Sequence, residues 1–174
     1  YRVHTVEEWG ANRTFDMMPS AEEPSRAEDG RGGPRRFLAF IENDLIPLID
    51  RSYASNPEDR AILGHSLGGF FVLYTLFKGA GAFARFCAGS PGRPEASRRD
   101  ELEYARTHSE LRARLAIVVG ELEQETLAST RELHDILAAR GYRGLESSLI
   151  PVSGESHLSV AGQLVNRGLR AIYS

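Results

Sequence analysis

Ser66 stands between two glycines where one apolar segment ends and another begins. Residues 61–74 read "AILGHSLGGFFVLY", and residues 64–68 fit the pattern G-x-S-x-G. In this pattern a strand enters a helix through one tight turn, and glycine two positions before and after the serine removes Cβ atoms that would collide there. The hydroxyl then lies exposed beside the positive end of a helix. The pattern predicts Ser66 as a nucleophile and the Leu67 backbone N–H as an oxyanion donor.

A serine hydroxyl is a weak nucleophile and needs a base that is oriented by an acid. In chains with this turn the order is serine, acid, histidine, and the last two lie on loops after later strands. His157 follows an expected strand in "SGESH" and precedes a helix, so it is the predicted base. His108 and His134 are expected on the solvated surface. His65, next to the serine, is expected to support the turn or to line a pocket.

The acid is expected directly after the strand that ends at Gly120. The sequence "GELEQE" offers three carboxylates there. Glu123 is far enough along the loop to turn back toward His157, so it is the predicted acid, and Glu121 is the alternative. A run of glutamates including Glu125 is also typical of a solvated helix N-terminus, where the helix dipole favours negative charge.

Composition limits the class of protein. The chain has 174 residues, 41% hydrophobic and 26% charged, which is typical of one globular domain. The net charge of −3 gives no reason to expect nucleic acid as a partner. The single cysteine, Cys87, excludes an internal disulfide framework and is expected to be a buried strand residue. No apolar run is long enough to span a membrane. Neither a metal nor an organic cofactor is implied.

The apolar pattern alternates between strands and helices after residue 56. This alternation predicts an α/β fold with a mostly parallel sheet flanked by helices. Ligands meet such sheets at the carboxyl ends of the strands. An earlier helix at 37–53 should bend near Asp44 because of Pro47. Residues 20–35 are expected to form an exposed flexible loop, and 101–114 an exposed helix or loop. The later strands are expected at 60–64, 85–88, 115–120 and 147–152, and the later helices at 67–78, 125–140 and 160–173, the last with Leu164, Val165, Leu169 and Ile172 inward.

Several segments resemble, in order, the putative-esterase family of α/β-hydrolases. The resemblance is greatest to its branch of siderophore (enterobactin-type) esterases, and the family also includes esterase D-like enzymes. It covers nearly the whole chain and implies the α/β-hydrolase fold and a small-molecule ester as substrate. After Ser90 and Pro91, where members often carry an aromatic pair, this chain has "GRPEASRRD". The matching segments are "NRTFDMMP", "GGPRRFLAFIENDLIPLIDRSY", "RAILGHSLGGFFVLYTLF", "SP", "VVGELEQ" and "GESHLSV".

These observations predict a serine hydrolase that cleaves a carboxylic ester through an acyl-enzyme, with Ser66, Glu123 and His157 as the triad. An acyltransferase with the same triad and a non-catalytic binding module of this fold are the alternatives. Family members begin with several strands and a loop that supplies a second oxyanion N–H. We therefore expect residues 1–174 to be the C-terminal two-thirds of a larger catalytic domain. The sequence indicates neither a compartment nor an oligomeric state.

Overall fold

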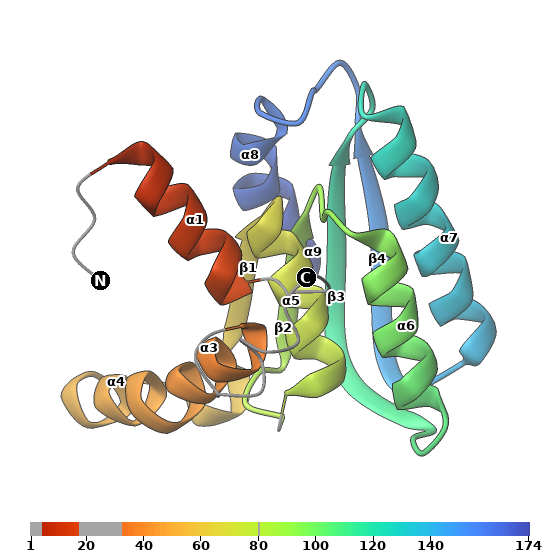
Figure 1. Ribbon diagram of the computed structural model, residues 1–174. Coiled ribbons are helices and arrows are strands. Elements are labelled where there is room, and N and C mark those ends of the chain that lie inside the picture. Colours follow the sequence, from red (N-terminus) through yellow and green to blue (C-terminus); the bar gives the residue numbers. More distant parts are fainter. Residues whose placement is uncertain (1–4, 18–32, 80) are drawn as a thin grey trace. The chain divides into compact units, whose positions relative to one another are not determined.

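The computed structural model describes residues 5–17, 33–79 and 81–174, and the chain divides into two compact units, residues 1–56 and 57–174. The regular elements described in the first unit are all helical. The second holds a sheet with helices on both faces (Figure 1). No helix in the described ranges has both the length and the apolar character to cross a membrane. The helical segments of the first unit are α1 (Val6–Met17), α3 (Pro34–Phe40), the π-helical turn η1 (Ile41–Leu45) and α4 (Ile46–Ser52).

The helix expected at 37–53 is present, and it changes geometry just before Pro47. In η1 the Ile46 N–H donates to the Ile41 carbonyl, a bond that spans five residues rather than four. Proline has no N–H and its ring crowds the carbonyl one turn earlier, so a widened turn at this point accommodates it. The helix starts earlier than expected, at the buried Pro34, a residue suited to the first helical position. Residues 20–32 of the expected loop lie outside the described residues.

The second unit contains the parallel sheet that the alternating pattern predicts. Its four strands follow the spatial order β1-β2-β3-β4, and every neighbouring pair is parallel. Their carboxyl ends lie at one edge, where His65 is in register with Gly89, and Gly89 with Val118. The strands are β1 (Ala61–His65), β2 (Arg85–Gly89), β3 (Glu110–Gly120) and β4 (Arg143–Val152).

Helices cover both faces of this sheet. As a result, every residue of β3 from 115 to 120 is buried. Leu115, Ile117 and Val119 face one side, and Ala116 and Val118 face the other, as strand alternation requires. On the first side lie α5 (Leu67–Lys78), α6 (Pro94–Ala105) and α7 (Gln124–Arg140); on the second lie α8 (Val160–Gln163), the π-helical turn η3 (Leu164–Gly168) and α9 (Leu169–Tyr173) (Figure 1).

The expectation for residues 101–114 is wrong in two respects. Glu101 is buried in α6 rather than exposed. Residues 110–114 belong to β3, where Leu111 and Ala113 are buried and Arg112 between them is exposed. Apolar and charged residues alternate over 110–114, which is the pattern of a half-buried strand, but the many charges there favoured an exposed segment.

The inward face of the last helix also differs from the expectation. Leu164 and Ile172 are buried, but Val165 and Leu169 are exposed, at 50% and 37%. The buried positions recur every fourth residue because η3 widens the turn, which brings Gly168 inward instead of Leu169. A Cβ on Gly168 would collide with the sulfur of Cys87 in β2. Cys87 is buried as expected, and burial raises the pKa of its thiol to about 12.

Candidate active site

Ser66 occupies a strained turn between β1 and α5. Its backbone dihedral angles are φ 60° and ψ −116°, a conformation that L-residues rarely adopt. Two hydrogen bonds hold the turn. The Ser66 N–H donates to the Gly89 carbonyl at 2.8 Å, and the Phe70 N–H donates to the Ser66 carbonyl at 3.0 Å. The turn therefore presents the side chain of Ser66 at the carboxyl edge of the sheet.

Glycines let the backbone pass this closely, though not in the way that the sequence suggested. A Cβ on Gly64 would collide with the backbone of Gly68, and a Cβ on Gly69 would lie 2.5 Å from the Gly89 carbonyl oxygen. A Cβ on Gly68 itself would meet no described atom within 4 Å beyond its chain neighbours and the nearby backbone of its own helix. The steric requirement therefore falls on Gly64 and Gly69, and Gly68 matters as the backbone that Gly64 approaches.

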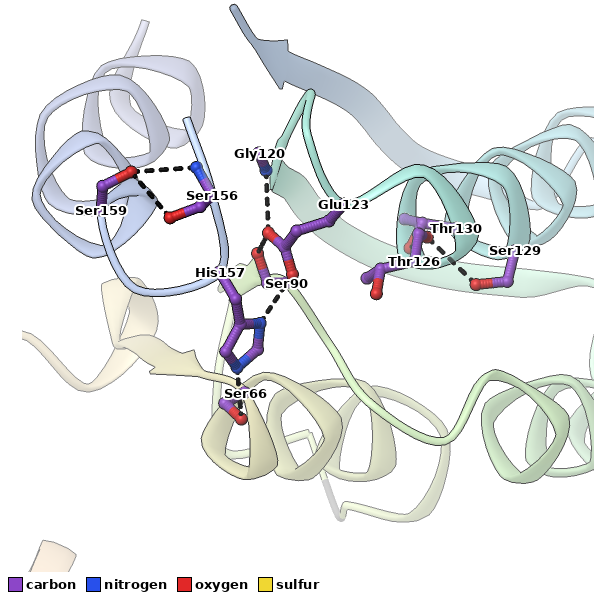
Figure 2. Close-up of polar contacts among 10 residues, drawn as sticks. All are labelled: Ser66, Ser90, Gly120, Glu123, Thr126, Ser129, Thr130, Ser156, His157 and Ser159. Atoms are coloured by element: carbon purple, nitrogen blue, oxygen red, sulfur yellow. Dashed lines mark hydrogen bonds and ion pairs between the residues drawn. The ribbon is translucent and has the colours of Figure 1, made fainter. Parts of the chain in front are cut away.

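The three predicted triad residues lie in one chain of hydrogen bonds (Figure 2). His157 Nε2 lies 3.0 Å from Ser66 Oγ. The other ring nitrogen, Nδ1, lies 2.6 Å from Glu123 Oε2. A neutral imidazole can make both contacts by donating from Nδ1 to the carboxylate and accepting at Nε2 from the hydroxyl. This arrangement leaves the serine proton directed at a base.

Glu123 ends a tight turn after β3 and folds back over it. Its N–H donates to the Gly120 carbonyl at 3.0 Å, and its Oε1 accepts the Gly120 N–H at 3.1 Å. Oε1 also accepts the Ser90 hydroxyl at 2.6 Å. A Cβ on Gly120 would collide with the Glu155 carbonyl, so glycine is required at this turn. The side chain of Glu123 is only 9% exposed.

The alternative acid, Glu121, points to a different part of the loop. Its Oε2 accepts the Ser153 hydroxyl at 2.7 Å and the Gly154 N–H at 3.3 Å. Glu125 is exposed in the first turn of α7. Of the three carboxylates in "GELEQE", it is Glu123 that contacts His157.

The loop that carries His157 is fixed at both ends. The Ser156 N–H donates to the Ser159 hydroxyl at 2.9 Å, just before α8 (Figure 2). On the other side, the Leu122 N–H of the acid loop donates to the Glu155 carbonyl at 3.0 Å. The side chain of His157 is 44% exposed, so the predicted base is accessible from solvent.

The remaining candidate residues surround this chain. The ring of His65 lies 4.8 Å from that of His157, centroid to centroid, so His65 contacts the predicted base. Leu67 is in the first turn of α5, where backbone N–H groups have no acceptor within the helix. His108 is exposed as expected and stacks on Tyr104. The expectation for His134 is wrong, because it is half-buried: only one side of α7 packs on the sheet, and His134 follows the buried Leu133 on its margin.

Three residues without a predicted role hold the predicted triad in place. Ser90 and Gly120 contact Glu123, and Ser159 fixes the loop that carries His157. The pair Ser90-Pro91 directly after a strand was a usable signal, since that position lies at the carboxyl edge of the sheet. In the described residues, no group of three or more His, Cys, Asp or Glu side chains is arranged to hold a metal ion.

Comparison with known proteins supports this fold and identifies a family. The model of the family described as "Putative esterase" matches residues 6–146, which include Ser66 and Glu123. This chain belongs to the esterase family. His157 lies beyond the matched range, and its hydrogen bonds in the structure place it with the other two.

Two relatives of this esterase-family chain cover most of its length. The ferri-bacillibactin esterase BesA of Bacillus subtilis (strain 168) is 36% identical over 95% of the chain and 63% of the relative. The crystal structure of BES protein from Bacillus cereus matches with a TM-score of 0.78 and 26% identity, over 94% of this chain and 64% of that one. This chain thus spans less than two thirds of either relative.

A more distant structure shows the fold alone. Siderophore hydrolase EstA from Aspergillus nidulans has a TM-score of 0.75 at 21% identity, over 96% of this chain and 67% of that one. The sheet flanked by helices is therefore the α/β-hydrolase arrangement that the sequence predicts.

Proposed function

We propose that this chain carries the catalytic triad of a serine esterase that cleaves ester bonds in siderophores or similar small molecules. The observation that carries the proposal is the continuous hydrogen-bonded chain from Ser66 through His157 to Glu123. The substrate class is supported by the 36% identity to a relative named ferri-bacillibactin esterase.

In this mechanism Ser66 Oγ attacks the acyl carbon while His157 Nε2 takes the hydroxyl proton. The oxyanion accepts the Leu67 N–H, which lies at the positive end of α5. The tetrahedral intermediate collapses, the C–O bond to the alcohol breaks, and His157 returns the proton to the leaving alcohol. Water then attacks the acyl-serine through the same base. Throughout, Glu123 stabilises the imidazolium and fixes its tautomer.

The test combines labelling of the serine with turnover of esters. The full-length protein is treated with a fluorophosphonate probe and assayed on a panel that contains a catecholate trilactone, a hydroxamate ester and a simple aryl acetate. Ser66→Ala should abolish labelling and lower kcat by about a thousandfold or more, with an unchanged thermal melt. Labelling and turnover that survive in this variant would reject the proposal. A wild-type protein that neither labels nor hydrolyses any ester would indicate a binding module.

A further inference from the structure

The two oxygens of the Glu123 carboxylate have separate partners. Oε2 contacts His157 Nδ1, and Oε1 accepts hydrogen bonds from the Ser90 hydroxyl and the Gly120 N–H (Figure 2). An ionised carboxylate only accepts hydrogen bonds, so Ser90 must be the donor. At 2.6 Å this contact is in the range of charge-assisted O–H···O⁻ bonds, which are stronger than neutral ones.

Ser90 itself is held in an unusual and buried position. It is 1% exposed, its φ is 39°, and its N–H donates to the Val118 carbonyl at 2.8 Å. A positive φ costs free energy for any residue with a Cβ, and such residues persist where the surroundings fix them. The preceding residue, Gly89, accepts the N–H of Ser66. The end of β2 therefore contacts both the turn of the nucleophile and the carboxylate of the acid.

We infer that Ser90 is a positioning residue, whose hydroxyl holds the Glu123 carboxylate in the orientation that presents Oε2 to His157. The inference rests on the proposed function. The terminal torsion of a glutamate side chain is broad and has no strong intrinsic preference. Without Ser90, Oε1 keeps only the Gly120 N–H as a donor from the described residues, and the carboxylate rotates more freely. His157 then spends less time in the orientation that accepts the serine proton.

Ser90→Ala in the full-length protein tests this inference through kcat. Alanine keeps the Cβ, so the strain at this position stays and only the hydroxyl is lost. We expect kcat to fall about tenfold to a hundredfold, with KM within about twofold, since the loss is of one charge-assisted hydrogen bond. Ser97→Ala is the matched control: Ser97 in α6 is also 1% exposed, its hydroxyl has no hydrogen-bond partner among the described residues, and kcat should be unchanged.

A double-mutant cycle separates positioning from a general structural role. In a Glu123→Ala background Ser90 has no carboxylate to hold, so adding Ser90→Ala should change kcat by less than about twofold. An equal loss in both backgrounds would overturn the inference. So would a Ser90→Ala variant with the kcat of wild type. The two failures are distinguishable. Turnover that survives in Ser66→Ala rejects the proposed function, whereas the Ser90 and Glu123 cycle tests only the role of Ser90.

A spectroscopic readout applies even if no ester is turned over. The proton between His157 Nδ1 and Glu123 should give a resolved low-field resonance in the NMR spectrum, as expected for a 2.6 Å bond to a carboxylate. Ser90→Ala should shift this resonance upfield or broaden it, and Ser97→Ala should leave it in place. A resonance that is identical in Ser90→Ala and wild type would overturn the inference.

Discussion

Two nearly buried glutamates, Glu123 and Glu101, are bound in similar ways at different places in the second unit. The side chain of Glu123 is 9% exposed and that of Glu101 is 2% exposed. Glu101 accepts hydrogen bonds from Arg140 Nε and from the Tyr142 hydroxyl, both at 2.9 Å. Both carboxylates are thus fixed by side chains that come from other elements.

The partners make the difference between the two sites. Arg140 carries a permanent charge, and it neutralises Glu101 without any exchange of protons. His157 can be neutral or charged, and its second nitrogen faces a hydroxyl. Burial in itself therefore does not mark a carboxylate as catalytic. What distinguishes Glu123 is its titratable partner, His157, which connects it to the predicted nucleophile Ser66 at the carboxyl edge of the sheet.

The largest effect that this comparison predicts is on turnover. Glu123→Gln keeps the shape of the side chain but removes the charge that stabilises the imidazolium, so kcat should fall about a hundredfold or more. Glu101→Gln should leave kcat within about threefold of wild type. Steady-state kinetics on the best ester of the panel measures both variants at equal foldedness, checked by thermal melts. A Glu101→Gln variant as inactive as Glu123→Gln would contradict the prediction that only Glu123 takes part in turnover.

The second effect is on stability, and here the change at Glu101 should have the larger effect and the change at Glu123 the smaller one. Glu101→Gln leaves a guanidinium beside a neutral amide, at a contact that joins α6 to the end of α7 and to Tyr142, just before β4. Breaking a fully buried ion pair costs about 3–5 kcal/mol. Because the side chain of Arg140 is 40% exposed, we expect about 2 kcal/mol and a Tm lower by about 4–8 °C. Urea denaturation and a thermal melt measure this. Glu123→Gln should shift Tm less than Glu101→Gln does.

The contrast between the two glutamates also shows what the sequence could reveal. A strand, a glycine-bounded serine and an apolar helix identify the Ser66 turn locally, and chain order then restricts the acid and the base to two loops. The structure brings Ser66, Glu123 and His157 into hydrogen-bond contact, while their catalytic roles stay predictions.

The parts that the sequence could not reveal depend on contacts between distant residues. Ser90 reaches Glu123 through a positive φ that no local pattern encodes. Glu101 lies in a run of charged residues and is buried only because Arg140 and Tyr142, about forty positions later, fold against it. Periodicity describes one element at a time, and these partners come from another element in each case.

A smaller effect concerns Tyr142, the neutral partner of Glu101. Burial, followed by the hydrogen bond to Glu101, raises the pKa of its hydroxyl above the ordinary value of 10.0. The unfolded chain therefore ionises first. The contribution of Tyr142 to stability is complete below about pH 10 and is lost as the pH rises through the folded pKa.

Tyr142→Phe tests this effect because it removes the hydroxyl and keeps the ring. The variant should lose about 1 kcal/mol at pH 8, which is the net value of one hydrogen bond. Urea denaturation at pH 8 and at pH 10.5 should show a steeper loss of stability for wild type than for the variant. Equal losses in the two proteins would show that other groups cause the alkaline destabilisation.

The smallest predicted effect on kcat is that of changing Glu121, the alternative acid, which lies two residues before Glu123. Its carboxylate is exposed and accepts hydrogen bonds from Ser153 and Gly154, in the turn after β4. Glu121→Gln keeps an acceptor oxygen for both donors, so the turn should hold its shape and kcat should change less than about threefold. Steady-state kinetics of Glu121→Gln beside Glu123→Gln measures the difference within one loop. If Glu121→Gln is the inactive variant and Glu123→Gln is active, the loop rearranges during catalysis and Glu121 is the acid, because a side chain that only supports the turn cannot have the larger effect.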